Sequence, residues 1–149
     1  MSEVRSICDE AYTVLSKIYG SNVPKSFNDR FNIECKIFDE NDSWDYLALG
    51  QKLSQMASSQ DYMAVPRGNL ASSLIAWLLG ITHVNPLPPH EYCPKCHKLF
   101  IRTDVKDEWD LPRTTCHCGT VMRRDGHDIP SYQVKNILKY TMAMSLLLK

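Results

Sequence analysis

Four cysteines in two close pairs constrain the fold of this chain more than any other feature. The pairs are Cys93-Pro-Lys-Cys96 and Cys116-His-Cys118-Gly119, and nineteen residues separate them. Zinc takes four thiolates at the corners of a tetrahedron, and paired cysteines on two tight turns supply such a set. Gly119 suits the left-handed backbone that a turn of this kind often needs. Four protein ligands leave no position open for water, so the spacing predicts a structural Zn²⁺ site rather than a catalytic one.

The second pair leaves the ligand set open, because its C-x-C spacing is one residue shorter than in a zinc ribbon. His97 or His117 is the alternative ligand if both sulfurs of this pair do not reach the ion. Two other interpretations are four unrelated free thiols and a redox C-x-x-C, but no thioredoxin-like strand and helix surround the first pair. Cys8 and Cys35 lie on apolar helical faces, where we interpret them as small buried hydrophobes.

The thiols are expected to be in a reducing compartment. The N-terminus lacks the long apolar run of a signal peptide, and no stretch approaches the roughly eighteen apolar residues of a membrane span. We therefore expect a cytoplasmic protein, in which clustered cysteines bind metal rather than form disulfides. The 17 basic and 17 acidic residues cancel, but residues 1–92 hold 7 Lys/Arg against 11 Asp/Glu and residues 93–149 hold 10 against 6. Any contact with nucleic acid is therefore expected in the second half.

Hydrophobic periodicity predicts a mostly helical first half and a second half that contains loops and strands. Apolar residues recur at helical spacing in residues 3–19, 44–58 and 70–79, and in helix-like fashion from Pro24 to Phe38. Residues 62–65 form a short apolar run before a proline and are expected to be a strand, followed by a turn at residues 67–69. The prolines in residues 85–90 predict a stiff, extended connector. Residues 131–149 return to helical periodicity.

Four rare strings follow one another along the chain. They are Arg67-Gly-Asn-Leu-Ala-Ser-Ser73, Ile81-Thr-His-Val-Asn-Pro-Leu-Pro-Pro-His90, Trp109-Asp-Leu-Pro112 and Asp125-Gly-His-Asp-Ile-Pro130. In this order they resemble the palm segment of C-family bacterial replicative polymerases, above all the PolC-type DNA polymerase III alpha subunit. In that family an R-G-S-x-x-S-S segment precedes a helix, and an I-T-x-V-N-P-L-P-P-H string leads into a cysteine-bearing zinc insert. The resemblance covers roughly residues 10–130.

The resemblance implies a phosphate-binding turn at the start of a helix. In the family this region receives the triphosphate of the incoming nucleotide, and a helix start offers free amide N–H groups to such an anion. The residues at these positions are Arg67, Gly68, Asn69, Ser72 and Ser73, with Asn69 where the family has serine. The alternative is that Arg67 and Gly68 are kept only as a turn that the fold needs.

The same resemblance implies that the chain is not a polymerase. Two-metal phosphoryl transfer needs clustered carboxylates, and in the family these aspartates follow the D-G-H-D-I-P string. Here no acidic residue follows Asp128, so autonomous DNA synthesis is not expected. Asp125, His127 and Asp128 are expected to have structural roles. Arg123 and Arg124, close to the second cysteine pair, are the candidate nucleic-acid contacts, and the alternative is that they belong to a solvated charged face.

The sequence therefore predicts an α+β protein in which helices pack on a partial polymerase palm with a zinc-ribbon subdomain. The expected units are residues 1–90 (helical and partial palm), 91–130 (zinc ribbon) and 131–149 (C-terminal helix). The favoured function is a non-catalytic zinc-binding module that binds nucleotide or nucleic acid weakly. The alternative is an interaction protein that docks on, or competes with, replisome components; a remnant without selected activity is a third hypothesis. No membrane contact is expected, and the oligomeric state is not predicted.

Overall fold

The chain has an α+β fold in which a group of helices is joined to a small antiparallel sheet. The computed structural model describes residues 2–21, 23–66 and 68–130. Within them the helices are α1 (Ser2–Tyr19), α2 (Lys25–Glu40), α3 (Trp44–Ser58) and α4 (Leu74–Leu78), with 3-10 helices η1 (Gly68–Ser72) and η2 (Glu108–Asp110). The strands are β1 (His90–Tyr92), β2 (Leu99–Ile101) and β3 (Arg123–Asp125). None of the described helices is both long and apolar enough to cross a membrane.

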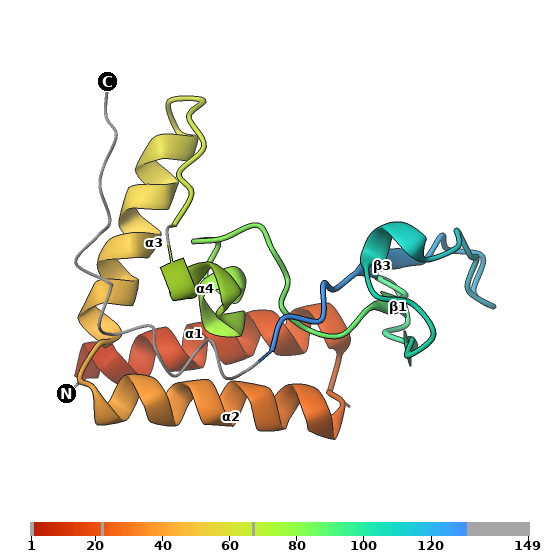
Figure 1. The fold of residues 1–149 in the computed structure, drawn as a ribbon, viewed down its shortest axis with the longest axis horizontal. Helices are drawn as coiled ribbons and strands as arrows, with labels where there is room; N and C mark the ends of the chain where they lie inside the picture. The colour runs from red at the N-terminus through yellow and green to blue at the C-terminus, as the bar shows by residue number, and fades with distance from the viewer. Residues whose placement is uncertain (1, 22, 67, 131–149) are drawn as a thin grey trace.

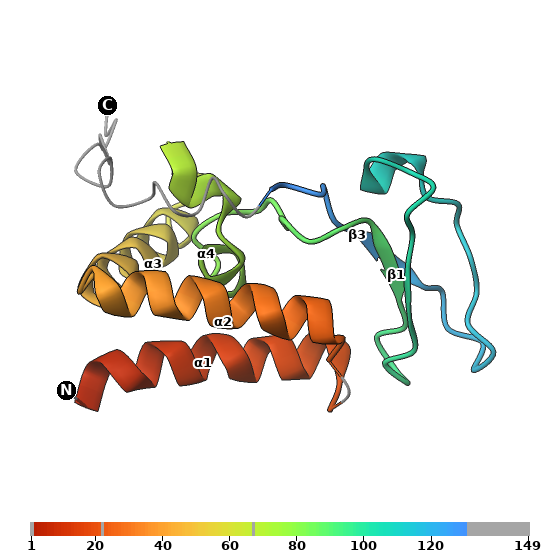
Figure 2. The ribbon, with the colours of Figure 1, turned by 60° about the horizontal axis from the view of Figure 1, so that its bottom comes forward.

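Helices α1 and α2 lie side by side and form the base of the helical part (Figure 1, Figure 2). Helix α1 buries Ala11, Leu15 and Tyr19, which are one turn apart, because this spacing keeps the three side chains on one face. Helix α2 buries Phe27 and Phe31 against this face. The rings of Tyr19 and Phe27 pack edge to face, with their centroids 5.2 Å apart. The short helix α4 packs on both α1 and α2 and closes the core, while α3 projects from one end.

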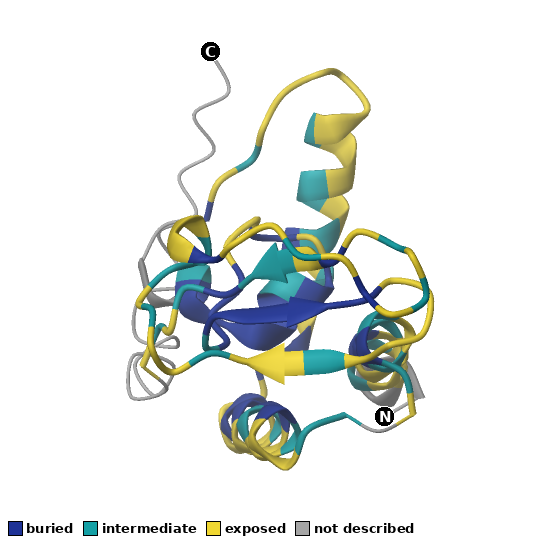
Figure 3. Ribbon diagram, turned by 90° about the vertical axis from the view of Figure 1, so that its right-hand side faces the viewer, coloured by how far each residue is buried: buried dark blue, intermediate teal, exposed yellow. Residues whose placement is uncertain are grey.

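The sheet lies beyond the end of the helical layer where α1 finishes (Figure 2). Its strand order is β2-β1-β3, and both pairings are antiparallel, so that Glu91 stands opposite Phe100 on one side and Arg124 on the other. All three residues of the central strand are buried, whereas the outer strands are partly exposed (Figure 3).

A buried joint connects the helices to the sheet, and two of the strings in the resemblance form it. Residues 127–129 run beside residues 85–87 and bond to them through the backbone. The amides of residues 127, 128 and 129 donate to the carbonyls of Asn85, Leu87 and Pro86, respectively, at 3.0–3.1 Å. The chain passes so close here that a Cβ on Gly126, whose φ is +102°, would lie 2.3 Å from the Pro88 carbonyl oxygen. Only glycine combines this positive φ with the absence of a Cβ, so it is the residue that fits here without strain.

The side chain of His90 completes the joint. Its Nδ1 donates to the Pro88 carbonyl at 2.7 Å, because a carbonyl only accepts, so Nε2 is the acceptor for the Tyr19 hydroxyl at 2.8 Å. The same hydroxyl accepts from Asn85 Nδ2 at 3.2 Å. Burial lowers the pKa of His90 and raises that of Tyr19, which favours the neutral form of both.

The structure confirms several of the elements that periodicity predicts. Helices 3–19 and 44–58 are present, and residues 24–38 lie in or beside α2. The expected helix 70–79 is divided into η1 and α4 at Ser73. The strand expected at residues 62–65 is wrong: the segment is irregular and Tyr62, Met63 and Val65 are exposed. Within the described part of the chain, no strand pairs with this segment. The expected C-terminal helix lies outside the described residues.

Candidate metal centre

The first cysteine pair lies on a tight turn between β1 and β2. The amide of Cys93 donates to the Lys98 carbonyl at 2.9 Å, and the amide of His97 donates to the Cys93 carbonyl at 3.0 Å. The turn is completed by His97 with a left-handed φ of +56°. Because the chain folds back over these few residues, the Cys96 amide points at the Cys93 sulfur at 3.5 Å. Such an N–H donor stabilises a thiolate.

The second cysteine pair also lies on a hydrogen-bonded turn with a left-handed residue, but one residue rather than two separates its cysteines. Thr115 and Val121 form an isolated antiparallel bridge, and inside it the Cys116 amide donates to the Thr120 carbonyl at 2.9 Å. Gly119 takes the left-handed position with a φ of +81°, and its amide donates to the Cys116 carbonyl at 2.8 Å. The C-x-C spacing therefore still forms a turn that projects both sulfurs to one side.

The two turns bring all four sulfurs to one point. The sulfurs of Cys93 and Cys118 are 3.5 Å apart, and those of Cys96 and Cys116 are 3.4 Å apart. All four lie within 4.8 Å of one another. A tetrahedral ion with metal–sulfur bonds of about 2.3 Å places its sulfurs roughly 3.8 Å apart. The sulfurs therefore have the spacing that a Cys₄ metal site requires, and the cluster can hold a metal ion.

The thiols of this cluster differ in acidity. Hydrogen bonds from the Thr120 side chain and backbone lower the pKa of Cys118 to about 6, and the Cys96 backbone amide lowers the pKa of Cys93. The Lys98 amide also lowers the pKa of Cys96, but its contacts with the Cys116 and Cys93 sulfurs outweigh this and raise it to about 12. The turns thus favour thiolates at two of the four positions, and a bound cation favours the thiolate at all of them.

The two histidines that were alternative ligands lie differently. His97 Nδ1 donates to the Ile18 carbonyl at the end of α1, 3.1 Å away, and its side chain packs against Gly20. This residue anchors the first turn to the helices. His117 Nδ1 lies 3.3 Å from the sulfur of its neighbour Cys116, on the exposed side of the second turn. Among the described residues the group that can share an ion consists of the four cysteines.

The residues expected to bind phosphate lie at the start of η1 and at the start of α4, apart from one outside the described residues. Arg67 lies outside the described residues, and Gly68 and Asn69 form the start of η1. Ser72 and Ser73 are buried. Ser73 is the N-cap of α4: its hydroxyl accepts from the Ala76 amide at 3.1 Å and donates to a carboxylate of α2 at 2.7 Å. Both roles of this hydroxyl are thus filled within the protein, and the phosphate-binding role stays a prediction.

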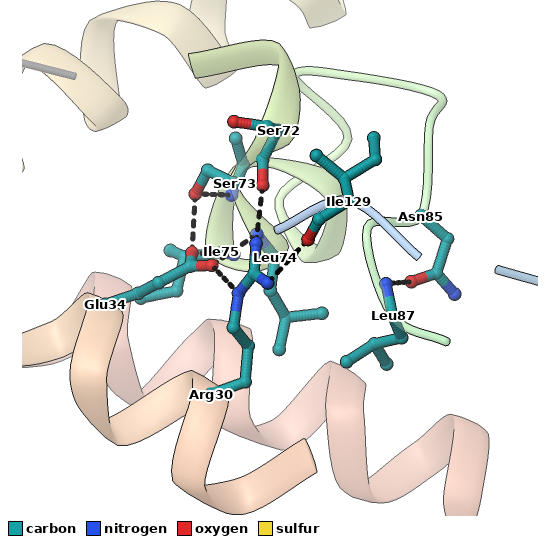
Figure 4. A network of polar contacts seen from close by, with 10 residues as sticks. Arg30, Glu34, Ser72, Ser73, Leu74, Ile75, Asn85, Leu87 and Ile129 are labelled. Atoms are coloured by element: carbon teal, nitrogen blue, oxygen red, sulfur yellow. Dashed lines mark hydrogen bonds and ion pairs between the residues drawn. The ribbon is translucent and has the colours of Figure 1, made fainter. Parts of the chain in front are cut away.

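That carboxylate belongs to Glu34, a residue that sequence analysis missed. Glu34 is fully buried and accepts four hydrogen bonds (Figure 4). Two come from the amides of Leu74 and Ile75 at 3.0 and 3.1 Å, the position where a bound anion would sit on a helix start. Arg30 supplies a third at 2.8 Å and also donates to the carbonyls of Ser72 and Ile129. The i, i+4 spacing of Arg30 and Glu34 was the only signal for this network.

The comparisons with known proteins point to one family. The bacterial DNA polymerase III alpha NTPase domain matches residues 5–138. The chain belongs to this family. It is 40% identical to the PolC-type DNA polymerase III of Bacillus subtilis (strain 168) over 128 residues, 38% identical to that of Thermotoga maritima over 117, and 35% identical to that of Staphylococcus aureus (strain Mu3) over 131. These matches cover 83%, 76% and 86% of this chain but 9% of each polymerase, so the chain spans about a tenth of its relatives' length.

In this PolC-related chain the two expected nucleic-acid contacts differ in their surroundings. Arg124 is partly buried and donates to the Leu111 carbonyl at 2.6 Å, which holds the loop before the second cysteine pair against β3. Arg123 is exposed and interacts with the Tyr92 hydroxyl. Burial raises the pKa of Tyr92, and the hydrogen bond with Arg123 offsets part of this rise. An open groove of about 520 Å³ runs past both arginines and Arg113. Of the two, Arg123 is the one whose charge faces solvent.

His127 of the D-G-H-D-I-P string contacts acidic residues of the loop that carries η2, and Asp125 Oδ1 accepts from the Gly126 amide at 2.9 Å. His127 Nδ1 lies 2.9 Å from Asp107 Oδ1, and its Nε2 lies 4.0 Å from Glu108. The pKa of Glu108 is raised, first by burial and then by the charge of Asp125. These contacts connect the string to the loop that carries η2.

Proposed function

We propose that this chain is a non-catalytic module of the PolC-type family in which Zn²⁺ at Cys93, Cys96, Cys116 and Cys118 stabilises a zinc ribbon over residues 91–130. The observation that carries the proposal is the convergence of the two cysteine pairs, which places the sulfur of Cys93 3.5 Å from that of Cys118 and the sulfur of Cys96 3.4 Å from that of Cys116. A Cys₄ set with tetrahedral spacing favours zinc, and it fills all four positions of the ion. The ion is therefore structural, and its binding free energy adds to that of folding.

The proposal that the chain is non-catalytic rests on its sequence. No acidic residue follows Asp128 in the sequence, where the resemblance puts the catalytic aspartates. Two-metal catalysis needs such carboxylates. Primer extension with Mg²⁺ and all four dNTPs is expected to yield no product, and template-dependent extension would refute this part.

The zinc proposal is tested by metal content and by chelation. The purified chain should carry one zinc ion by native mass spectrometry, and a strong chelator should lower the melting temperature and abolish the NMR signals of the sheet. Cys96→Ser should lose the ion, whereas the matched control Cys35→Ser, outside the cluster, should keep it. A metal-free chain that melts identically with and without chelator would refute the site.

Weak DNA binding is the second part of the proposal, and the groove beside β3 supports it. Arg113 and Arg123 are both exposed at this groove, which Asp125 also lines, and their positive charges can face a phosphate backbone. The chain carries no net charge, so this local charge must supply the attraction. We expect weak affinity that falls steeply with salt, because only a few phosphates can be neutralised.

Fluorescence anisotropy with labelled single- and double-stranded DNA at low salt tests this part. Arg123→Ala should weaken binding to every sequence and reduce the salt slope by about one ion. The matched control is Lys52→Ala, which removes an exposed charge on α3 that is not among the residues lining the groove. The melting temperature measured with and without dNTP tests nucleotide binding, and Arg67→Ala should abolish any rise in that temperature. No binding of DNA or dNTP at low salt would refute the binding proposal while leaving the zinc proposal intact.

One observation favours the alternative, a protein that docks on replisome components. Helix α3 exposes Tyr46, Leu49 and Met56, which recur at the spacing of a helix-packing stripe, and Met63 is 74% exposed in the segment that follows. The paired change Leu49→Glu with Met56→Glu should abolish binding to a purified polymerase if this stripe is the docking face. Unchanged binding of the pair would refute that role.

A further inference from the structure

Two cysteines outside the metal centre face each other across the helical layer. Cys8 on α1 and Cys35 on α2 have their sulfurs 3.1 Å apart, although 27 positions separate them in the sequence. Both pack against the large helical core, whereas the metal-centre cysteines form a separate small cluster. Interpreting Cys8 and Cys35 only as buried hydrophobes accounts for their packing but not for the sulfur contact.

The contact needs little movement to become a bond. A disulfide places its sulfurs about 2.05 Å apart, so the two atoms must approach by roughly 1 Å to form one. Helices α1 and α2 lie side by side (Figure 2), and the two sulfurs lie 3.1 Å apart between them. Both cysteines are also only partly buried, so a small reagent can reach them.

A second metal site at this position is less well supported than a bond between the sulfurs. The described residues offer no third His, Cys, Asp or Glu that would share an ion with this pair. Two thiols alone do not fill the coordination of zinc. The chemistry that remains for two facing thiols is their mutual oxidation.

We propose that Cys8 and Cys35 are a reversible disulfide pair that links α1 to α2. The oxidant is a small-molecule disulfide. A Cys8 thiolate attacks one sulfur of the oxidant, forms a mixed disulfide and releases the first small thiolate. The Cys35 thiol then gives up its proton and attacks the Cys8 sulfur, so that the Cys8–Cys35 bond forms and the second small thiolate leaves. Two protein thiols are oxidised and one small disulfide is reduced to two thiols.

The order of attack follows from the surroundings of the two sulfurs. Burial raises the pKa of Cys8, and the hydrogen bond with Cys35 lowers it in part. Burial and that same hydrogen bond both raise the pKa of Cys35. Cys8 is therefore the first nucleophile and Cys35 the resolving thiol. Because the thiolate of each is disfavoured, the reaction should be slow at neutral pH and accelerate as the pH rises.

Incubation of the full-length, zinc-loaded chain with oxidised glutathione tests the proposal. Free thiols are alkylated in denaturant, and the peptides are mapped before and after reduction. The expected result is one cross-linked peptide pair containing Cys8 and Cys35, with the four metal-centre cysteines still alkylated. The linked chain should melt several degrees above the reduced one, because the bond restricts the unfolded state. A reductant should reverse both changes.

Matched variants make the outcome decisive. Cys35→Ser should stop at a stable glutathione adduct on Cys8, and Cys8→Ser should show no cross-link. The proposal is overturned if the wild-type chain keeps both thiols free at high pH, if Cys8 retains glutathione despite Cys35, or if cross-links form only among the metal-centre cysteines. The wild-type map alone distinguishes these results, so the test does not depend on the folding of either variant.

Discussion

The buried carboxylate of Glu34 allows the sharpest test of how this fold is held together. Glu34→Gln preserves the shape of the side chain but replaces one acceptor oxygen by an N–H donor. The carboxylate oxygens each accept two hydrogen bonds, one from a backbone amide of α4 and one from Arg30 or Ser73. Whichever way the amide of glutamine turns, one buried backbone N–H of α4 then faces a donor.

The magnitude follows from these contacts. A buried donor left without an acceptor destabilises the fold by about 1–3 kcal/mol, and hydrogen bonds to a charged group contribute about 1.5–3 kcal/mol. We expect Glu34→Gln to lower the free energy of unfolding by about 3 kcal/mol. Glu34→Ala removes the carboxylate that neutralises the Arg30 guanidinium, whose side chain is 11% exposed, and should lower the free energy of unfolding by about 3–5 kcal/mol. Since small domains are stable by about 5–15 kcal/mol, the alanine variant approaches unfolding.

Urea unfolding followed by circular dichroism measures these losses. The midpoint should fall in the order wild type, Glu34→Gln, Glu34→Ala, with the denaturant dependence unchanged. The matched control is Glu40→Gln on the same helix, because Glu40 is exposed and its replacement should change stability by less than about 0.5 kcal/mol. If Glu34→Gln unfolds within that same margin of the wild type, the four hydrogen bonds do not hold the start of α4 and the reasoning fails.

Three further substitutions test the joint and the helix cap. Gly126→Ala should destabilise the chain by roughly 2–4 kcal/mol, because its Cβ would meet the Pro88 carbonyl. The control Gly80→Ala, at a φ of +71° but with open space around it, should cost only about 1 kcal/mol. Equal losses of stability in urea unfolding would contradict the close approach at Gly126. Ser73→Ala should lose about 1–2 kcal/mol with the N-cap of α4, measured in the same way. The free energy of unfolding should fall as the pH drops below about 6.5, since the depressed pKa of His90 lets only the unfolded chain bind its proton there. His90→Asn should flatten this dependence, and an unchanged pH profile would show that another group is responsible.

The sequence predicted α1, α2, α3 and the two cysteine turns because these are local patterns. Helix α1 repeats its apolar residues every turn, and each cysteine pair lies within a single turn of chain, so neighbours in the sequence are sufficient to define them. The strand expected at residues 62–65 failed for the opposite reason. A strand exists only where another segment pairs with it, and β-propensity alone does not reveal whether one is available.

The buried polar groups were beyond prediction from the sequence for a related reason. Glu34 occurs in a helix rich in charged residues, and nothing in its own segment distinguishes it from exposed Glu40. Its partners on α4 lie about 40 positions away. Arg123 and Arg124 are neighbours with the same chemistry, yet strand alternation turns one to solvent and the other toward the Leu111 carbonyl. Only the fold distinguishes such pairs.

The contact between the metal centre and the helices has a consequence for how the fold responds to metal loss. The first cysteine turn rests on the end of α1, where His97 donates to the Ile18 carbonyl and a Cβ on Gly20 would lie 2.8 Å from the His97 Cβ. The left-handed φ of His97 is set by the same turn that aims the sulfurs of Cys93 and Cys96. If the proposed ion holds the four sulfurs, its removal frees the first cysteine turn and weakens the contact of His97 with the end of α1. Metal loss should therefore increase amide exchange at the end of α1 as well as in the sheet, because the two parts share this residue.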